Sequence, residues 1–277
     1  MAEFILVLFG VSIIAGFLGA LAGLGGGVLI VPALTIGFGA DIRYAIGASI
    51  VSVIATSSGA AAAYVRDRIT NLRVGMFLEL ATTSGAIVGA LVAGLVNPSV
   101  LFVIFGLALL VSVIPLAARL GEELPSGVAS DVWATRLRLA SSYEDAVLHR
   151  RVSYQVTKVP LGLALMWLAG LLSGLLGIGS GAFKVLAMDV AMRMPMKVST
   201  TTSNFMIGVT AAASAGIYFS RGDVNPLVAA PVALGVLIGA GLGSRHLLRL
   251  SNRSTRLVFI PLLVAIAIEM LLHGLGV

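Results

Sequence analysis

Two clusters of glycine, one in each half of the chain, are the residues whose types and spacing point most directly to chemistry. They read Gly23-Leu24-Gly25-Gly26-Gly27 and Gly177-Ile178-Gly179-Ser180-Gly181. Glycine is unfavourable inside helices, so each cluster predicts a break that frees backbone N–H groups, which together with the helix dipole attract anions. Close helix packing is the alternative interpretation. We predict an anion site that includes Gly25, Gly26, Gly27, Gly179, Ser180 and Gly181.

Hydroxyl and amide side chains follow each glycine cluster. The first half offers Ser49, Ser52, Thr56, Ser57 and Ser58, and the second offers Thr200, Thr201, Thr202, Ser203, Asn204 and Thr210. Neutral donors suit a dehydrated oxyanion, because they bind it without trapping it. A single serine in a membrane helix is better explained by hydrogen bonding between helices. We therefore assign Ser49, Thr201, Thr202, Ser203 and Asn204 to the predicted site as a group.

Lys184 follows the second cluster by three residues, where the first half has Ile30. Charges within a membrane are costly and usually functional, so we include Lys184 in the anion site. Pairing with Asp189 and snorkelling to the interface are the alternatives. Glu79 also lies within an apolar segment, but no motif assigns it a role.

Arg43 and Lys197 occupy equivalent positions in the two halves, each at the start of a predicted helix. They are predicted to gate the substrate path or to anchor the helix ends. The three histidines are scattered and cysteine is absent, so the sequence offers no pattern for a metal site and predicts no cofactor. Gly179-Ser180-Gly181 invites an intramembrane protease, but no histidine lies where it could activate Ser180. We predict no enzyme.

The composition indicates a helical membrane protein. Of 277 residues, 58% are hydrophobic and 11% are charged, and the mean hydropathy is +1.07. Apolar blocks fall at about 4–38, 42–65, 73–95, 98–118, 158–190, 197–219, 225–247 and 256–275. The start of the chain lacks the basic region of a signal peptide. The net charge of +6 is expected from basic loops beside a lipid bilayer rather than from nucleic-acid binding.

The two halves align without a gap at an offset of 154 positions, and identical pairs include Gly23/Gly177, Tyr64/Tyr218 and Asn71/Asn225. This register predicts an all-α fold of two repeats, each with a glycine-broken first segment followed by three transmembrane helices. The predicted boundaries are 1–118 for the first repeat, 119–157 for a connector and 158–277 for the second repeat.

Basic residues predict the orientation. When the arginine-rich connector is placed in the cytoplasm, most lysines and arginines fall inside, whereas Arg43 and Arg221 lie outside. Each repeat then contains an odd number of segments, so the second is inverted, and both termini face outward from the inner membrane. Ser130-Asp131 predicts the cap of a short connector helix that runs through Trp133 to Tyr143.

The motifs resemble those of the TauE/SafE family of sulfite exporter-like proteins, also described as toluene-sulfonate uptake permeases. The matching stretches are 22–32, with Ala45-Ile46-Gly47-Ala48-Ser49 after it, and 176–181, with 197–203 after it. The second copy departs from the family pattern at Ser180, Phe183-Lys184 and Leu186. The resemblance implies transport of sulfite, sulfoacetate or related organosulfonates, usually outward.

The sequence therefore predicts a membrane transporter that exports small sulfur-containing anions by alternating access. A passive anion channel and an uptake permease for another anion are the alternatives. Beyond the small anionic substrate and the bilayer, a homo-oligomer is left open as a partner.

Overall fold

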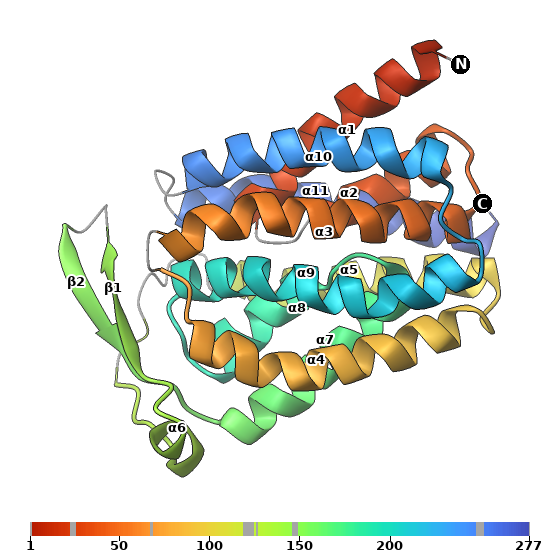
Figure 1. Ribbon diagram of the computed structural model, residues 1–277. Helices are drawn as coiled ribbons and strands as arrows, with labels where there is room; N and C mark the ends of the chain where they lie inside the picture. The colour runs from red at the N-terminus through yellow and green to blue at the C-terminus, as the bar shows by residue number, and fades with distance from the viewer. Residues whose placement is uncertain are drawn as a thin grey trace.

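The computed structural model describes residues 2–22, 26–66, 69–118, 125, 127–145, 149–247 and 252–276. These residues form a bundle of long helices with a small hairpin at one end, and both termini lie at the opposite end (Figure 1). Four helical stretches are long and apolar enough to cross a membrane: Glu3–Ala20, Leu72–Ala93, Val159–Leu176 and Pro226–Gly243. The prediction of a helical membrane protein is confirmed at this level.

Both halves contain the same sequence of elements. The first half contains α1 (Ala2–Ala22), α2 (Gly27–Pro32), the π-helical segment η1 (Ala33–Gly37), α3 (Ile42–Arg66), α4 (Leu72–Ala93) and α5 (Pro98–Ala118). The second contains α7 (Val159–Leu176), α8 (Gly181–Leu186), the π-helical segment η2 (Ala187–Ala191), α9 (Met196–Ser220), α10 (Pro226–Leu247) and α11 (Asn252–Leu275). The bounds of α2, η1 and α3 recur in α8, η2 and α9 at the offset of the sequence repeat.

The halves are interlocked. The first helix of each half packs against the fourth helix of the other, so α1 contacts α10 and α7 contacts α4. Glycines allow these approaches: a Cβ on Gly174 would lie 1.9 Å from the carbonyl oxygen of Ala86, and one on Gly239 would lie 2.0 Å from that of Ile13. Small residues at four-residue spacing let membrane helices approach to backbone contact. This packing holds α3 and α9 together at the centre of the bundle.

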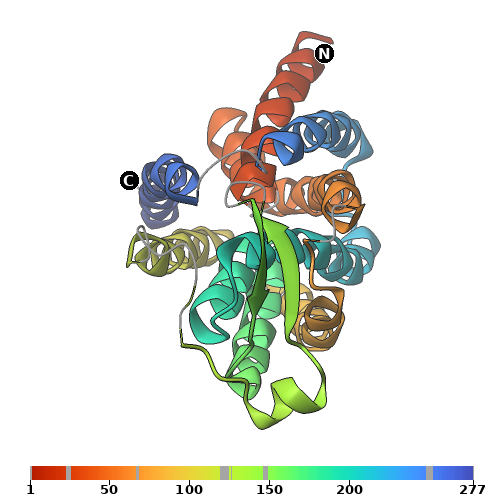
Figure 2. The same ribbon diagram turned by 90° about the vertical axis from the view of Figure 1, so that its left-hand side faces the viewer.

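The connector differs from its prediction. Asp131 caps a helix as expected, since its side chain accepts a hydrogen bond from Ala134 N at 2.6 Å, but this helix, α6 (Val132–Arg136), has only five residues. Tyr143 lies instead in strand β1 (Ser141–Asp145), which pairs antiparallel with β2 (Arg150–Tyr154). The hairpin crosses one end of the bundle (Figure 2). The helix predicted from Trp133 to Tyr143 is therefore wrong beyond Arg136, where the chain continues into a small hairpin beside the helical bundle.

Hydrogen bonds attach the connector to the helices. Asn71 caps α4 by accepting from Val74 N at 3.1 Å, and its amide nitrogen donates to Leu139 O at 3.0 Å and to the Tyr154 hydroxyl at 2.8 Å. Burial raises the pKa of Tyr154 to about 12, so this hydroxyl keeps its proton at neutral pH. The connector is thus an ordered cap on the ends of α4 and α9.

Candidate functional site

The second glycine cluster forms the predicted break, between α7 and α8. Gly177 and Gly179 have φ values of +66° and +68°, which glycine adopts at low cost, and Ser180 has a φ of +45°. Partners satisfy the free carbonyls at the end of α7. The buried Tyr218 hydroxyl donates to Gly174 O at 2.6 Å, and Ser49 Oγ donates to Gly177 O at 2.7 Å. The broken backbone is therefore held in place from both halves.

The two breaks meet between α3 and α9. A Cβ on Gly27 would lie 2.5 Å from Ser49 Oγ and 3.0 Å from Gly177 O, so the start of α2 touches the other break. A Cβ on Gly179 would lie 2.9 Å from Val53 of α3 and 2.7 Å from Ile207 of α9. Glycine lets these backbones come together, so Gly27, Ser49 and Gly179 lie close to one another.

Two predicted polar residues in this region have unsatisfied side chains. Ser180 is 1% exposed, and its Oγ has no hydrogen-bond partner among the described residues. Asn204 is fully buried, and neither its Nδ2 nor its Oδ1 has one. Leaving such a group unpaired costs about 1–3 kcal/mol, and native proteins keep few of them. Ser203 Oγ donates to Gly181 O at 3.3 Å, so α9 contacts the start of α8 directly after Ser180.

The main chain beside Asn204 is also tied to the first half. Ser57 of α3 donates a short hydrogen bond to Asn204 O and accepts one from Gly208 N at 3.0 Å. A carbonyl and the N–H four residues later pair with each other in a regular helix. One hydroxyl of the first half therefore contacts the α9 backbone directly beside the free amide.

The other predicted site residues have structural partners or lie apart. Thr201 Oγ1 donates to Lys197 O at 3.0 Å, within its own helix. Thr202 Oγ1 accepts from Asn71 N at 3.1 Å and so supports the start of α4. Gly26 precedes α2, where an added Cβ would make only ordinary contacts of 3.4 Å or more. Gly25 falls outside the described residues.

Lys184 is fully buried, so it does not snorkel to the membrane surface. Its Nζ donates to Thr210 Oγ1 of α9 at 2.5 Å, and Thr210 Oγ1 donates to Glu79 Oε1 of α4 at 2.6 Å. Glu79 is 8% exposed, and its Oε2 has no partner among the described residues. Sequence reasoning left Glu79 and Thr210 without a specific role, because no spacing rule connects α4 with α8.

Arg43 and Lys197 each tie the start of a helix to a loop. Arg43 donates to Val96 O, between α4 and α5, at 3.3 Å. Lys197 pairs with Asp145 of the hairpin at 2.9 Å, and the Asp145 side chain is only 4% exposed. These contacts are those expected of anchoring residues, and they would have to open if either residue gated a path.

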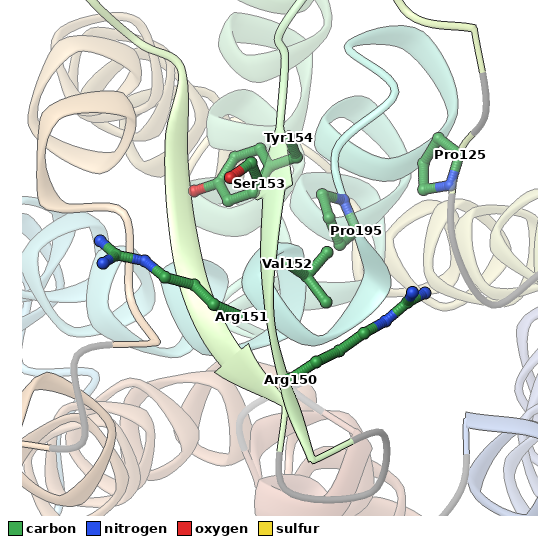
Figure 3. A pocket seen from close by; sticks show the side chains of 7 residues that line it. All are labelled: Pro125, Arg150, Arg151, Val152, Ser153, Tyr154 and Pro195. Atoms are coloured by element: carbon green, nitrogen blue, oxygen red, sulfur yellow. The ribbon is translucent and has the colours of Figure 1, made fainter.

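A cavity of about 280 Å³ lies at the connector, away from the glycine breaks. Strand β2 lines it with Arg150 to Tyr154, together with Pro125 and Pro195 (Figure 3). Arg150 and Arg151 point to opposite sides of the strand in this view. Only one of these two arginines can therefore serve a single bound group, and the cavity adds no residue to the site between the halves.

Replacing Ser180 with glycine tests whether the Ser180 hydroxyl binds a ligand, because the Ser180 backbone has a positive φ that serine adopts only at a cost. A non-glycine residue at positive φ costs about 1 kcal/mol, so Ser180→Gly should stabilise the protein by roughly that amount. The same change removes a free donor, so sulfite should raise the melting temperature less than in the unchanged protein. Thermal unfolding with and without sulfite measures both effects. A less stable variant with an unchanged sulfite response would contradict the assignment.

Comparisons with known proteins identify the family of this chain. Residues 8–270 match the family model described as Sulfite exporter TauE/SafE. The chain is 27% identical to the Probable membrane transporter protein YunE of Bacillus subtilis (strain 168), over 99% of both chains. It is 26% identical to the Probable membrane transporter protein ORF9 of Sinorhizobium sp, over 95% of this chain and 91% of that protein.

No solved structure is significantly similar to this chain. The family and these relatives are named for membrane transport, and none of the names describes an enzyme. Because the family model matches nearly the whole sequence, this protein belongs to the sulfite exporter TauE/SafE family of membrane transporters.

Proposed function

We propose that the protein carries small sulfur-containing anions, such as sulfite, sulfoacetate or other organosulfonates, and exports them from the cell. The unsatisfied side chains of Ser180 and Asn204, buried beside a broken backbone, carry this proposal. A sulfonate or sulfite group presents three oxygens that accept hydrogen bonds, and these side chains supply neutral donors. Lys184, one helical turn from Ser180, supplies a positive charge.

We also propose that the two halves form an inverted repeat and transport by alternating access. Equivalent helices run in opposite directions in Figure 1: α3 runs toward the hairpin, whereas α9 runs away from it. The glycine contacts agree with these helix directions. Gly235 lies against Phe9 and Ser12, whereas Gly243 lies against Phe17 and Ala20. Helices α1 and α10 are therefore parallel. Carriers of this type bind substrate where discontinuous helices of the two repeats meet.

The charge distribution supports a cytoplasmic connector in an inner-membrane protein. The starts of α4, α7 and α9 lie at the hairpin end, together with Arg73, Lys158 and Lys197. Arg43 and Arg221 lie at the other end, where both termini are found. Cytoplasmic loops carry the excess of lysine and arginine, so this orientation places both termini outside.

Exchange in proteoliposomes tests the proposal. Vesicles containing the purified protein are loaded with sulfoacetate, and the entry of radiolabelled sulfite is followed. A carrier should show saturable entry that internal sulfoacetate accelerates, whereas a channel should show entry without acceleration. Asn204→Ala should reduce the exchange about tenfold, which is the loss expected from one hydrogen bond to a charged group.

Ser58→Ala provides the matched control. Ser58 lies on α3, is exposed on the outside of the bundle, and donates only to Ile54 O of its own helix. This variant should exchange sulfite at the rate of the unchanged protein. Equal rates in the Asn204 variant and the Ser58 variant, with both proteins folded, would contradict the assigned site. Exchange of chloride but of no sulfur oxyanion would contradict the substrate class.

A further inference from the structure

The hydrogen-bonded chain of Lys184, Thr210 and Glu79 joins the two halves through buried charges. Lys184 lies on α8 and Thr210 on α9 of the second half, whereas Glu79 lies on α4 of the first. Thr210 Oγ1 accepts a hydrogen bond from Lys184 and donates one to the Glu79 carboxylate. Such a chain depends on how the two halves sit against each other, so movement between them would break it.

The equivalent positions of the repeat lack this chain, although the elements that carry them are the same. The positions equivalent to Lys184, Thr210 and Glu79 are Ile30, Thr56 and Ala233. Thr56 donates to Ser52 O of its own helix at 2.8 Å. An apolar pair therefore suffices for packing around the threonine. Because buried ion pairs seldom stabilise more than apolar residues of similar size, the charges call for a functional explanation.

We propose that Glu79 is a proton-binding site that couples proton movement to anion transport; this inference rests on the transport function proposed above. In the unloaded protein, ionised Glu79 balances Lys184, so the buried site has no net charge. When Glu79 accepts a proton from water, the carboxyl becomes neutral and the positive charge of Lys184 is left for an anion. The loaded site, with one proton on Glu79 and one sulfonate group beside Lys184, is again neutral.

Electrostatics favours this order over anion binding alone. An anion that entered beside ionised Glu79 would give the buried site a net negative charge, which is costly in a medium of low dielectric constant. Proton and anion therefore bind together and move in the same direction. Their combined gradients set the direction of transport, so the anion leaves the cell when its outward gradient exceeds the inward gradient of protons.

Few other titratable groups face the network. Among the described elements, α4 packs against α7 and α9, and α8 packs against α5, α7, α9 and η2. Helices α5 and α7 contain no charged residue. Asp189 lies on η2, five residues after Lys184, and has an interaction of its own. Lys197 and Arg73 lie in the first turns of α9 and α4, and Lys197 is paired with Asp145.

The test uses radiolabelled sulfoacetate and the full-length protein in proteoliposomes. In the unchanged protein, a pH gradient with the more acidic solution outside the vesicles should drive accumulation of the anion inside them. Glu79→Gln should still exchange internal for external sulfoacetate at equal pH, because glutamine imitates the protonated carboxyl. Its accumulation under a pH gradient should fall about tenfold, within the usual range of coupling between two ligands. Asp189→Asn should accumulate sulfoacetate normally.

Infrared titration gives a readout that does not need transport. Acidification should produce a carboxylic-acid band in the unchanged protein. This band should be missing from Glu79→Gln and from the double variant Glu79→Ala/Lys184→Ile, which carries the residue types of the equivalent repeat positions. The proposal would be overturned if the unchanged protein and Glu79→Gln gave the same infrared band. It would also be overturned if Asp189→Asn, and not Glu79→Gln, lost pH-driven accumulation. Absence of any sulfoacetate exchange by the unchanged protein would contradict the proposed transport function, and the infrared band would still decide whether Glu79 binds a proton.

Discussion

Gly27→Ala is expected to slow anion exchange strongly, although it adds only one methyl group. That group would lie 2.5 Å from Ser49 Oγ and 2.7 Å from Val53 Cγ2, both on the buried face of α3. It would also lie 3.0 Å from Gly177 O, so α2, α3 and the second break would all have to separate. Overpacking of this kind costs about 1–3 kcal/mol. If this cost raises the activation barrier of the transport cycle, exchange slows about ten- to a hundredfold.

Gly26→Ala is the matched control. The neighbouring position adds the same methyl group to the same turn, but its nearest contacts are 3.4 Å away and it has no positive φ. This variant should fold and exchange sulfite like the unchanged protein, as measured in the same proteoliposomes. Equal loss in both variants would mean that the whole glycine cluster is needed for folding, and that the contact between the two breaks has no special part in transport.

The repeat and both breaks could be predicted from the sequence, because glycine acts through the local backbone. The positions at which α2, η1 and α3 begin recur in the second half at the offset read from identical residues. The π-helical segment forms in both copies, even though Leu186 replaces Pro32 before it. The register of the small residues therefore determines this part of the fold, and the proline does not.

Contacts between distant segments could not be predicted in the same way. Ser49 lies in the polar run of the first half, but its hydrogen bond goes to Gly177 of the other break, and no local pattern indicates that partner. Tyr218 is identified in the sequence only as the repeat partner of Tyr64, yet it is 1% exposed and its hydroxyl donates to the end of α7. The interlocked packing of α1 on α10 and of α7 on α4 determines these partners.

The hairpin was missed for a related reason. Asp131 is a correct helix cap, but the helix that it begins ends after Arg136, and the chain then continues into β1. Helical spacing from Trp133 to Tyr143 was a plausible pattern in an arginine-rich segment. Tyr143 and Tyr154 pack instead with Val74 and Val198 at the ends of α4 and α9. Burial against a surface that the sequence does not show outweighed the local helical preference.

Lys184→Met is expected to destabilise the protein more than any other change at the network. Methionine has nearly the shape of lysine but no charge, so Glu79 would remain buried opposite Thr210 without its positive partner. Removing one member of a buried charge pair costs about 3–5 kcal/mol, because the other charge is left uncompensated. The melting temperature in detergent should fall sharply, and it should recover in part at acidic pH, where Glu79 takes up a proton.

The double variant Glu79→Ala/Lys184→Ile separates packing from function. It introduces the apolar residue types that Ala233 and Ile30 provide at the equivalent repeat positions, so its melting temperature should lie well above that of Lys184→Met. Transport should not recover with stability, since the charge that meets the anion is gone. A double variant that accumulates sulfoacetate under a pH gradient would show that these charges serve the fold alone. A stable double variant that accumulates no sulfoacetate would show that the buried charges are needed for transport and not for the fold.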